Sequence, residues 1–464
     1  MTVQPIGAAL DLLADRDPDR PAVHEVPSGR TVTRREVADR SAALAAAWAD
    51  AVAPEDLVGL HLGNTADLVV ACAAVWRLGA TPLPLPPEPA TVLDVAAPAL
   101  VVGSLPDPTP GRIADRPPAS SWKATSSGGS TGAPKVVVST GRATVDPDAD
   151  VAPYLPREQI QLVSGPLHHS APFTYALRGL MTGHTLVLLD RFSPAAVLAA
   201  IPRFGVTWAL LVPSMLHRLA RHPDVGAADL GSLRHLVHLG APCPPGLKRW
   251  WLDRVGAERV VEVYASSESA GITMIRGDEW LAAPGSVGRP VGGSEFRVVD
   301  ARGTELPTGE VGEVIMTRTG GPRYRYLGGT ARRVPGWEGW DALGDLGWLD
   351  DEGRLFLVDR ADDVIRRDGH EVHPARVEAA LERHPAVRSA AVFELHGGVH
   401  ALLDLDREAD PDAVVAAAEL PPWAVPTGVE LVGGPLRDDA GKVRRHALRA
   451  ARLSGGAGSG RRDG

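Results

Sequence analysis

The middle of the chain alternates short apolar runs with segments of helical periodicity. The runs predicted as strands are 185–189, 206–212, 233–239 and 259–264. Helix signals lie between them: Ser193-Pro194 supplies an N-cap followed by a first-turn proline, and further helices are predicted at 213–221 and 244–255. Strands that alternate with helices in this way predict βαβ units and a largely parallel sheet.

The two ends of the chain extend this picture. Near the start, Thr33 and Glu36 form a capping box, and Val37, Leu44 and Trp48 follow at helical spacing. Proline-rich stretches at 82–89 and 105–118 are predicted as loops. After a predicted hairpin at 348–356 comes a compact pattern of short elements. These are a helix at 374–383, strands at 387–395 and 399–405, a helix at 411–419 and a strand at 428–432.

The predicted fold class is therefore α/β. A large N-terminal domain, residues 1–359, contains mixed sheets of βαβ type flanked by helices, and a small α+β domain, residues 360–453, follows it. The Gly/Ser/Arg-rich tail 454–464 is predicted to be disordered.

Composition excludes several classes of protein. Of 464 residues, 44% are hydrophobic, which is typical of a globular chain. A net charge of −9 argues against nucleic-acid binding, because that partner demands a positive surface. Two cysteines, Cys72 and Cys243, are too few for a disulfide framework. The longest apolar run, 68–76, is about half the length that a membrane span needs, and residues 1–20 lack a signal-peptide pattern. We therefore expect a soluble, cytoplasmic protein with no membrane span.

The basic residues are unevenly divided between arginine and lysine. Only four of the 48 are lysines: Lys123, Lys135, Lys248 and Lys442. Lys123 lies three residues before a glycine-rich loop, and Lys248 is expected on the surface of a helix. By itself this bias toward arginine assigns no role to any of the four lysines.

The segment from Ser126 to Lys135 is the most informative in the sequence. It reads Ser-Ser-Gly-Gly-Ser-Thr-Gly-Ala-Pro-Lys, and its glycines allow several backbone N–H groups to turn toward one point, as polyphosphate binding requires. A polar surface loop is the alternative from glycine and serine alone. A P-loop is excluded because Ala133 and Pro134 separate the last glycine from the lysine. A serine hydrolase elbow at Ser130 is disfavoured because a turn and a strand follow it, where a helix is required.

A second group of polar residues follows the predicted strand 259–264. Here Ser266, Ser267 and Glu268 offer the oxygen ligands that magnesium prefers, at the carboxyl edge of a sheet. A metal site at His168 and His169 is disfavoured, because adjacent side chains diverge and no Asp or Cys clusters nearby.

Together these segments resemble the adenylate-forming superfamily, which includes acyl-CoA synthetases, adenylation domains and luciferases. The resemblance covers most of the chain and implies a role for each segment. The implied nucleotide-binding residues are Ser127, Gly128, Gly129, Ser130, Thr131, Gly132, Lys135, Gly240, Ala241, Pro242, Tyr264, Ala265, Ser266, Ser267, Asp345 and Arg360. Tyr264 would lie on adenine, Asp345 would hold the ribose, and Glu268 with Ser267 would hold Mg²⁺. Ala265 and Ser267 depart from the family's glycine and threonine.

The resemblance also implies catalytic and mobile parts. Lys442, Glu268 and His169 are the implied catalytic residues, with Lys442 bridging the attacking carboxylate and the α-phosphate. Asp362 would be the hinge of a mobile C-terminal lid, and Gly369 would lie on the loop that promotes thioester formation. The implied acyl pocket contains His169, Phe173, Ser266 and Ile272.

The implied function is ATP-dependent activation of a carboxylic acid as an acyl-adenylate, with release of pyrophosphate and transfer to a thiol. The implied cofactors are ATP, Mg²⁺ and coenzyme A, or the phosphopantetheine of a carrier protein. Activation of another oxyacid such as nitrite, in diazo or N–N bond formation, stays open. A non-catalytic nucleotide-binding protein is disfavoured, because both Lys442 and Glu268 are present.

Overall fold

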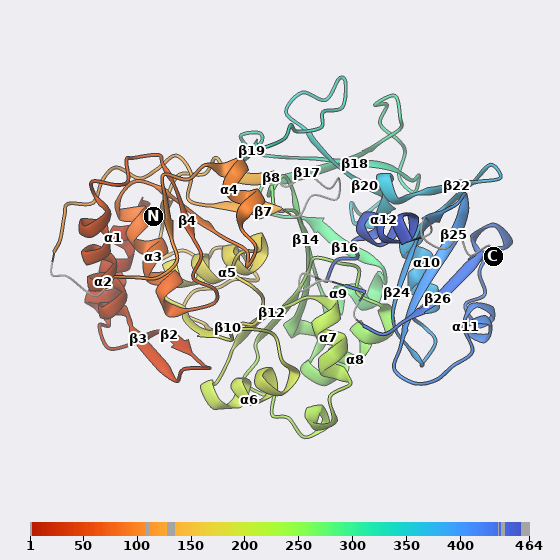
Figure 1. The fold of residues 1–464 in the computed structure, drawn as a ribbon, viewed down its shortest axis with the longest axis horizontal. Helices are drawn as coiled ribbons and strands as arrows, with labels where there is room; N and C mark the ends of the chain where they lie inside the picture. The colour runs from red at the N-terminus through yellow and green to blue at the C-terminus, as the bar shows by residue number, and fades with distance from the viewer. Residues whose placement is uncertain (1, 107–110, 128–134, 435, 438–440, 456–464) are drawn as a thin grey trace, which may run out of the picture.

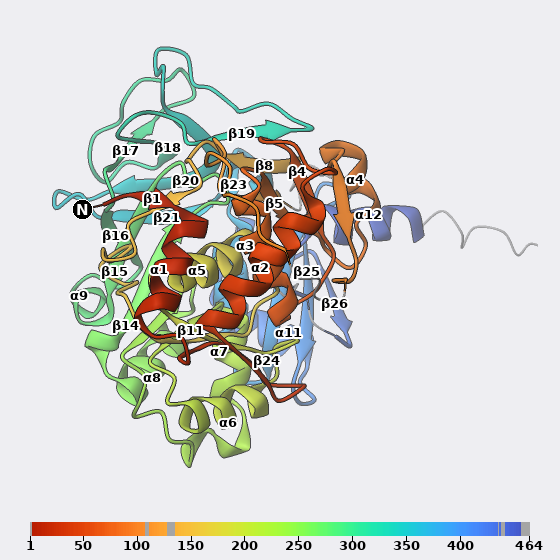
Figure 2. The same ribbon diagram turned by 90° about the vertical axis from the view of Figure 1, so that its left-hand side faces the viewer.

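The computed structural model describes residues 2–106, 111–127, 135–434, 436–437 and 441–455. The first part of the chain packs three helices together, as Figure 2 shows. These are α1 (Ile6–Arg16), α2 (Arg34–Trp48) and α3 (Ala66–Arg77). The predicted capping box is confirmed, because the Thr33 hydroxyl accepts from the Glu36 N–H and the Glu36 carboxylate accepts from the Thr33 N–H. Nearly every residue of α3 is buried, so the longest apolar run of the sequence is a core helix.

A small parallel sheet lies beside these helices. Its strands are β5 (Thr81–Pro84), β4 (Leu57–Leu60) and β6 (Leu100–Val102), and α4 (Ala90–Ala96) precedes the last of them. The short strands β1 (Gln4–Pro5) and β9 (Thr144–Val145) also pair with each other. Among the described residues, no helix combines the length and the apolar character that crossing a bilayer requires.

The predicted βαβ units form the parallel part of the main sheet. Its strands, in spatial order, are β14 (Val260–Ala265), β13 (His235–His238), β12 (Trp208–Leu211), β10 (Ile160–Val163), β11 (Thr185–Leu188) and β2 (Pro21–Glu25). β3 (Arg30–Thr33) adds an antiparallel edge. The helices between the strands are α5 (Ser170–Met181), α6 (Pro194–Phe204), α7 (Pro213–Ala220) and α8 (Pro245–Val255). The predicted α/β class is confirmed.

Beyond β14 the same sheet becomes antiparallel. Its further strands, in spatial order, are β15 (Ile272–Arg276), β16 (Ser286–Pro290), β21 (Leu355–Arg360), β20 (Asp341–Leu349), β18 (Gly312–Arg318) and β17 (Ser294–Val299), with α9 (Gly277–Ala282) after β15. β20 and β21 form the predicted hairpin, in which Trp348 pairs with Phe356. A separate sheet contains β7 (Ala124–Ser127), β8 (Lys135–Ser139) and β19 (Tyr324–Leu327).

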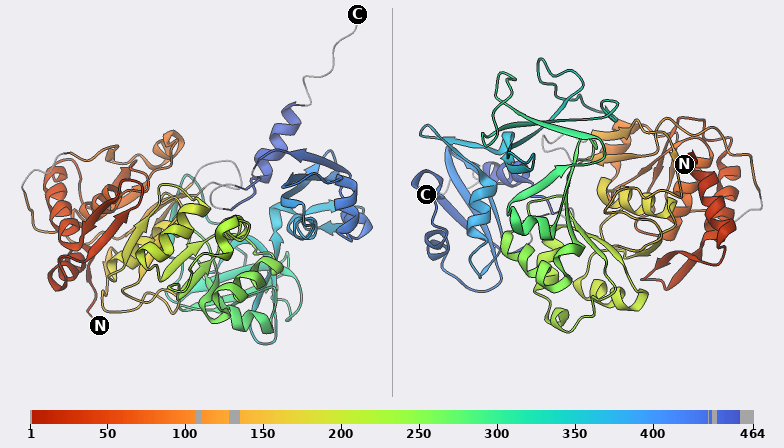
Figure 3. Two further views of the ribbon diagram at one scale, coloured as in Figure 1. Left: turned by 90° about the horizontal axis from the view of Figure 1, so that it is seen from below. Right: turned by 180° about the vertical axis from the view of Figure 1, so that it is seen from behind.

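The described elements from Ile365 onward pack around apolar clusters of their own, on one side of the molecule in Figures 1 and 3. The elements are β22 (Ile365–Arg367), β23 (His370–Val372), α10 (Pro374–Leu381), β24 (Val387–Leu395), β25 (Gly398–Leu405), α11 (Pro411–Ala417), β26 (Gly428–Val432) and α12 (Arg445–Gly455). β24 and β26 have the predicted bounds. α12 extends to Gly455, so Ser454 and Gly455 belong to a helix and not to the predicted tail.

The expected position of Lys248 on the surface of a helix is also wrong. It lies on α8 as predicted, but its side chain is 1% exposed and is ion-paired with Glu262 of β14. Its ammonium also lies 4.6 Å from the centre of the Trp280 ring. The helical periodicity of 244–255 identified the helix but not Trp280, which a later helix, α9, places over this lysine.

A buried carboxylate joins the elements of the C-terminal part. Glu378 of α10 is 3% exposed and accepts from the Val392 N–H of β24 at 2.8 Å. It also accepts from the guanidinium of Arg445, the first residue of α12, at 2.8 Å. Arg445 donates in turn to Asp363 at 2.6 Å. Burial raises the pKa of Glu378 to about 7, and the positive charge of Arg445 opposes that rise.

We predict that Glu378→Ala destabilises the C-terminal part by about 3 kcal/mol, because it leaves a buried guanidinium with one carboxylate fewer. Native-state hydrogen exchange of the β24 and β25 amides measures the opening free energy. Glu371→Ala is the matched control, because Glu371 forms an exposed pair with Arg366 and should contribute under about 1 kcal/mol. Equal effects of the two substitutions would contradict the prediction.

Candidate active site

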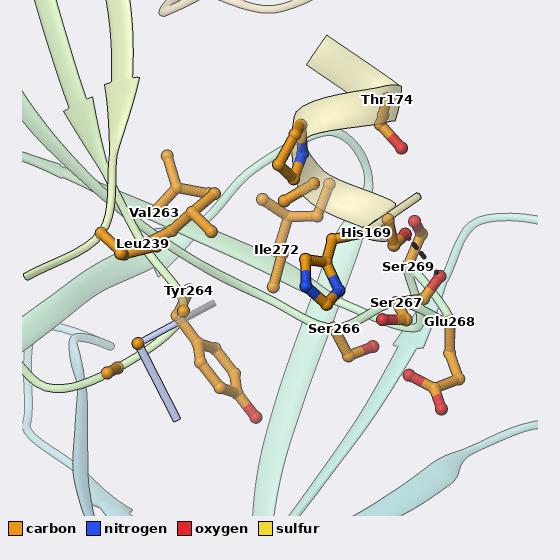
Figure 4. Close-up of a pocket in the computed structure, with 18 of the residues that line it drawn as sticks. His169, Thr174, Leu239, Val263, Tyr264, Ser266, Ser267, Glu268, Ser269 and Ile272 are labelled. Atoms are coloured by element: carbon orange, nitrogen blue, oxygen red, sulfur yellow. Dashed lines mark hydrogen bonds between the residues drawn. The ribbon is translucent and has the colours of Figure 1, made fainter. Parts of the chain in front are cut away.

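A cleft with a volume of about 2020 Å³ is lined by residues from both the N-terminal and the C-terminal parts of the chain. Most of the candidate residues meet there. Those that line it are Lys135, His169, Gly240, Ala241, Pro242, Tyr264, Ala265, Ser266, Ser267, Glu268, Ile272, Asp345, Arg360, Asp362 and Lys442. In Figure 4 the His169 ring lies between Tyr264 on one side and Ser267 and Glu268 on the other.

Asp345 links three strands at one edge of the cleft. Its Oδ2 accepts from the Tyr264 hydroxyl of β14 at 2.6 Å, and its Oδ1 accepts from Arg360 of β21 at 3.0 Å. The β20–β21 register places Asp345 directly opposite Arg360. Burial, with the nearby Asp345 charge, raises the pKa of the Tyr264 hydroxyl well above its ordinary value. The tyrosine is therefore a hydrogen-bond donor held in a fixed orientation.

Glu268 lies across the cleft from that group. Its Oε1 accepts from the Tyr326 hydroxyl of β19 at 2.6 Å. The Tyr326 ring also lies under the Lys135 ammonium, 5.0 Å from its centre. Tyr326 therefore joins the two sequence motifs that carry Lys135 and Glu268, although it belongs to neither.

Two turns at the ends of strands complete this side of the cleft. Gly240 follows β13 and has a φ of 92°, a left-handed conformation that glycine adopts without strain. The Ser266 hydroxyl, which follows β14, is buried and has no hydrogen-bond partner among the described residues. A buried hydroxyl without a partner is costly, so Ser266 is suited to bind a ligand.

His169 is the N-cap residue of α5, and the Ser170 hydroxyl next to it donates to the Ser267 carbonyl at 3.5 Å. This contact ties the start of α5 to the segment that carries Glu268, and Figure 4 shows His169, Ser267 and Glu268 around one space.

The Lys442 segment closes the cleft from the C-terminal side. A Cβ at Gly441 would lie 3.2 Å from a Val212 methyl group and 3.4 Å from the Ser214 hydroxyl, so the backbone lies directly on the start of α7. Lys442 therefore faces the same cleft as Glu268 and Tyr264.

Two candidates, Phe173 and Gly369, do not line the cleft. Phe173, expected as a wall of the acyl pocket, is fully buried in the core beside Trp122 and does not line the cleft, because it lies on another face of α5. Gly369 lies in the turn between β22 and β23, also outside the cleft. Ser127 is described only by its backbone, which pairs with Lys135. Gly128, Gly129, Ser130, Thr131 and Gly132 lie outside the described residues.

Lys123 and Arg178 are two of the cations that line the cleft without having been predicted as site residues. Lys123 is 4% exposed, and burial together with the charge of Arg178 lowers the pKa of its ammonium to about 7. Burial also lowers the pKa of Arg178, to about 10. The rarity of lysine and the position of Lys123 near the glycine-rich loop were the signals for it in the sequence. Nothing in the local pattern indicated Arg178.

The residues of the cleft fit magnesium bound together with phosphates. Within the described ranges, no three His, Cys, Asp or Glu side chains gather as a metal-binding group. Magnesium usually takes one or two protein carboxylates and completes its shell with water and substrate phosphates. Glu268 is placed to supply such a carboxylate, opposite the Lys135 side chain.

Comparison with known proteins is consistent with this geometry. A family model described as AMP-binding enzyme matches residues 10–96 and 125–321. Feruloyl-CoA synthase of Amycolatopsis sp is 35% identical over 274 residues, which are 57% of this chain and 54% of that protein. A fatty acid–[acyl-carrier-protein] ligase of Streptomyces coeruleorubidus is 31% identical over 62% of this chain and 58% of that protein. The matches thus span little more than half the length of these relatives.

Solved structures match along almost the whole chain. The amide bond synthetase McbA from Marinactinospora thermotolerans superposes with a TM-score of 0.81 at 28% identity, covering 96% of this chain and 99% of that one. The o-succinylbenzoate CoA synthetase from Bacillus subtilis superposes with a TM-score of 0.78 at 24% identity, covering 97% and 99%.

We predict that the low pKa of Lys123 makes stability depend on pH. Between about pH 7 and 10 the unfolded chain binds a proton on this lysine that the folded chain does not, so folding is favoured as the pH rises. The free energy of unfolding of the wild type should rise relative to Lys123→Met by up to about 1.4 kcal/mol per pH unit. Urea denaturation at pH 7, 8 and 9 measures this difference.

Arg203→Leu is the control for that experiment. Arg203 lies over the Phe204 ring at 4.9 Å on an exposed part of α6, so its effect on stability should not change over this pH range. A constant difference between wild type and Lys123→Met would mean that Lys123 keeps an ordinary pKa.

Proposed function

Because the chain belongs to the AMP-binding enzyme family, we propose that it activates a carboxylic acid with ATP as an acyl-adenylate, releases pyrophosphate and transfers the acyl group to the thiol of coenzyme A. The observation that carries the proposal is the meeting of Lys442 with Glu268, Tyr264 and Asp345 around one cleft. These residues come from distant parts of the sequence and together supply the charges that adenylation needs.

The chemistry explains why these charges are needed. A carboxylate is a poor acyl donor, because its leaving group would be oxide. Attack of the carboxylate on the α-phosphate of ATP forms the new C(O)O–P bond and breaks the bond to pyrophosphate, so that AMP becomes the later leaving group. Two anions must approach each other in this step. Positive groups held in place at the reacting atoms therefore contribute most of the rate enhancement.

The nucleotide has a defined place in this proposal. Tyr264 lies beside the turn at Gly240, where it can cover an adenine ring, and Asp345 with Arg360 can hold the ribose hydroxyls. Lys135 and the glycine-rich loop would bind the β- and γ-phosphates. Glu268 would hold Mg²⁺, which neutralises phosphate charge when it is bound. Lys442 would contact both the attacking carboxylate and the α-phosphate.

The second half-reaction requires a different arrangement of the C-terminal part. We propose that residues 360–453 rotate as a lid about Asp362 relative to residues 1–359. The rotation would withdraw Lys442 from the cleft and bring in the turn that carries Gly369, where a thiol attacks the acyl carbonyl and expels AMP. The position of Gly369 outside the cleft that contains Lys442 supports two alternating arrangements.

A panel of carboxylic acids tests the proposed activity. With ATP and Mg²⁺, pyrophosphate release should depend on the acid, and a thioester should form when coenzyme A is added. Parallel assays replace coenzyme A with phosphopantetheine on a carrier protein or with an amine. They show which of these acceptors takes the acyl group. Adenylation with thioester formation only on the carrier protein would overturn the choice of coenzyme A. Pyrophosphate release with nitrite and with no carboxylic acid would overturn the choice of acid.

Lys442→Ala separates the two half-reactions. We expect pyrophosphate release to fall by about 10²–10³-fold, the usual effect of removing one charged group from a reacting oxyanion. Thioester formation from added acyl-AMP and coenzyme A should stay within about threefold of the wild type, because Lys442 then lies outside the cleft.

Arg449→Ala is the matched control for this substitution. Arg449 lies on α12 and pairs with Glu394 away from the cleft, so both half-reactions should be retained. Equal loss of both half-reactions in Lys442→Ala would refute the role given to this lysine.

A further inference from the structure

The cleft contains a second positive group further along α5 from His169. Ser170, Thr174 and Arg178 all line the cleft and are spaced four residues apart, so they share one face of the helix. Lys123 joins them from the residue before β7. Figure 4 shows Thr174 further along α5 than His169.

Within the described ranges, the hydrogen-bond partners of Lys123 are neutral. Its ammonium donates to the Ser170 hydroxyl at 2.8 Å and to the Thr174 hydroxyl at 2.7 Å. An ammonium has three N–H donors, so one remains after these two bonds. The side chain is almost entirely removed from solvent, and water supplies little compensation for its charge.

Arg178 is the second cation of the group. Its guanidinium lies 4.1 Å from the centre of the Trp122 ring, and the Lys123 ammonium lies 5.5 Å from the same ring. Its hydrogen bond within the chain, to the Thr144 carbonyl, is long at 3.5 Å. Trp122 therefore holds two like charges near one another.

No carboxylate in the described ranges forms an ion pair with either Lys123 or Arg178. Of the other buried cations, Arg77 and Lys248 each contact a carboxylate, whereas Arg34 donates to the Gly183 carbonyl. Burial of the Lys123 charge beside the like charge of Arg178, without an anion, is unfavourable unless another group compensates it. A ligand that carries a negative group would do so.

The position of the group separates it from the polyphosphate site. The Lys123 carbonyl accepts from the Ser139 N–H, so Lys123 lies at the end of the β7–β8 hairpin opposite the glycine-rich loop. Four residues of strand, about 13 Å, separate it from Ser127. Arg178 lies about 12 Å along α5 from Ser170. Arg178 therefore lies along α5 away from His169, in the direction in which an acyl chain would extend, and Lys123 lies between Arg178 and the reacting end, bonded to Ser170 and Thr174.

We propose that Lys123 and Arg178 form a subsite for a second anionic group on the acid that this enzyme activates. The substrate class is then a dicarboxylic acid, or an acid with an equivalent anionic substituent, and this inference rests on the proposed adenylating function. One carboxylate would react beside His169 and Lys442, and the other would receive hydrogen bonds from Lys123 and Arg178.

The Ser170 hydroxyl connects the subsite to the reacting end. It accepts from Lys123 and donates to the carbonyl of Ser267, the residue before Glu268. An anion bound at Lys123 would thus be positioned relative to the magnesium carboxylate by a short chain of hydrogen bonds. A monocarboxylic acid of the same length would leave both cations without an anionic partner.

The test compares monocarboxylic acids, aliphatic and aromatic, with dicarboxylic acids of the same skeletons. Pyrophosphate release at fixed ATP and Mg²⁺ gives kcat/KM for each acid in the wild type, Lys123→Met, Arg178→Leu and the control Arg203→Leu. For the preferred skeleton we expect the wild type to favour the dicarboxylic acid by about tenfold or more, as a charge-assisted hydrogen bond provides. Lys123→Met and Arg178→Leu should each reduce this ratio about tenfold, whereas Arg203→Leu should keep it.

The outcomes distinguish the two proposals. Two outcomes would overturn the subsite and leave the adenylating function intact. One is equal pyrophosphate release with the monocarboxylic and the dicarboxylic acid of every pair. The other is a preference for the dicarboxylic acid that persists in both Lys123→Met and Arg178→Leu. A rise in the KM for ATP in Lys123→Met with an unchanged acid ratio would assign the cations to the polyphosphate and overturn the subsite. No release with any acid would instead refute the adenylating function. Circular dichroism and thermal denaturation of each variant establish that it is folded.

Discussion

The carboxylate of Asp345 is the contact on which the geometry of the cleft depends. It fixes the Tyr264 hydroxyl at the end of the parallel strands and the Arg360 guanidinium on the antiparallel strands. Arg360 is also the last residue of β21, immediately before the segment that leads to the C-terminal part. The Asp345 carboxylate therefore connects the parallel and the antiparallel parts of the main sheet. It does so next to the segment that leads from β21 to Asp362. The proposed rotation of the C-terminal part would therefore begin next to Arg360, which lines the cleft.

Buried charge has two different roles in this protein. At Glu378 and Arg445, and at Lys248 and Glu262, opposite charges meet within hydrogen-bond distance and join elements that are distant in sequence. In each pair the two opposite charges neutralise each other, so their burial requires no charged ligand. Lys123 lies in the same kind of interior, and no carboxylate of the described residues pairs with it. Charge pairs that hold the fold together therefore contrast, within one chain, with a lysine that the proposed subsite would use.

From the sequence, the bounds of helices and strands were predicted more accurately than the surfaces against which they pack. Strands β24 and β26 have their predicted bounds and the Thr33 capping box is present, because periodicity, caps and prolines are local properties. The same local pattern could not show that Phe173 faces the core or that Lys248 lies beneath Trp280. Those positions depend on which surface packs against a helix, and that surface comes from another part of the chain.

The residues of the candidate site could also be predicted only in part, and here the reason is chemical. Residues of the recognisable motifs converge because parallel strands end at one edge of a sheet, so Tyr264, Glu268 and the Gly240 turn were predictable together. Tyr326 and Arg178 lie outside every motif, yet Tyr326 contacts Glu268, and Arg178 lies over the same Trp122 ring as Lys123. The motifs supply the groups that every substrate of such a reaction shares, namely ATP and a carboxylate. The groups that distinguish one acid from another must differ between enzymes, and they therefore lie where no shared motif can indicate them.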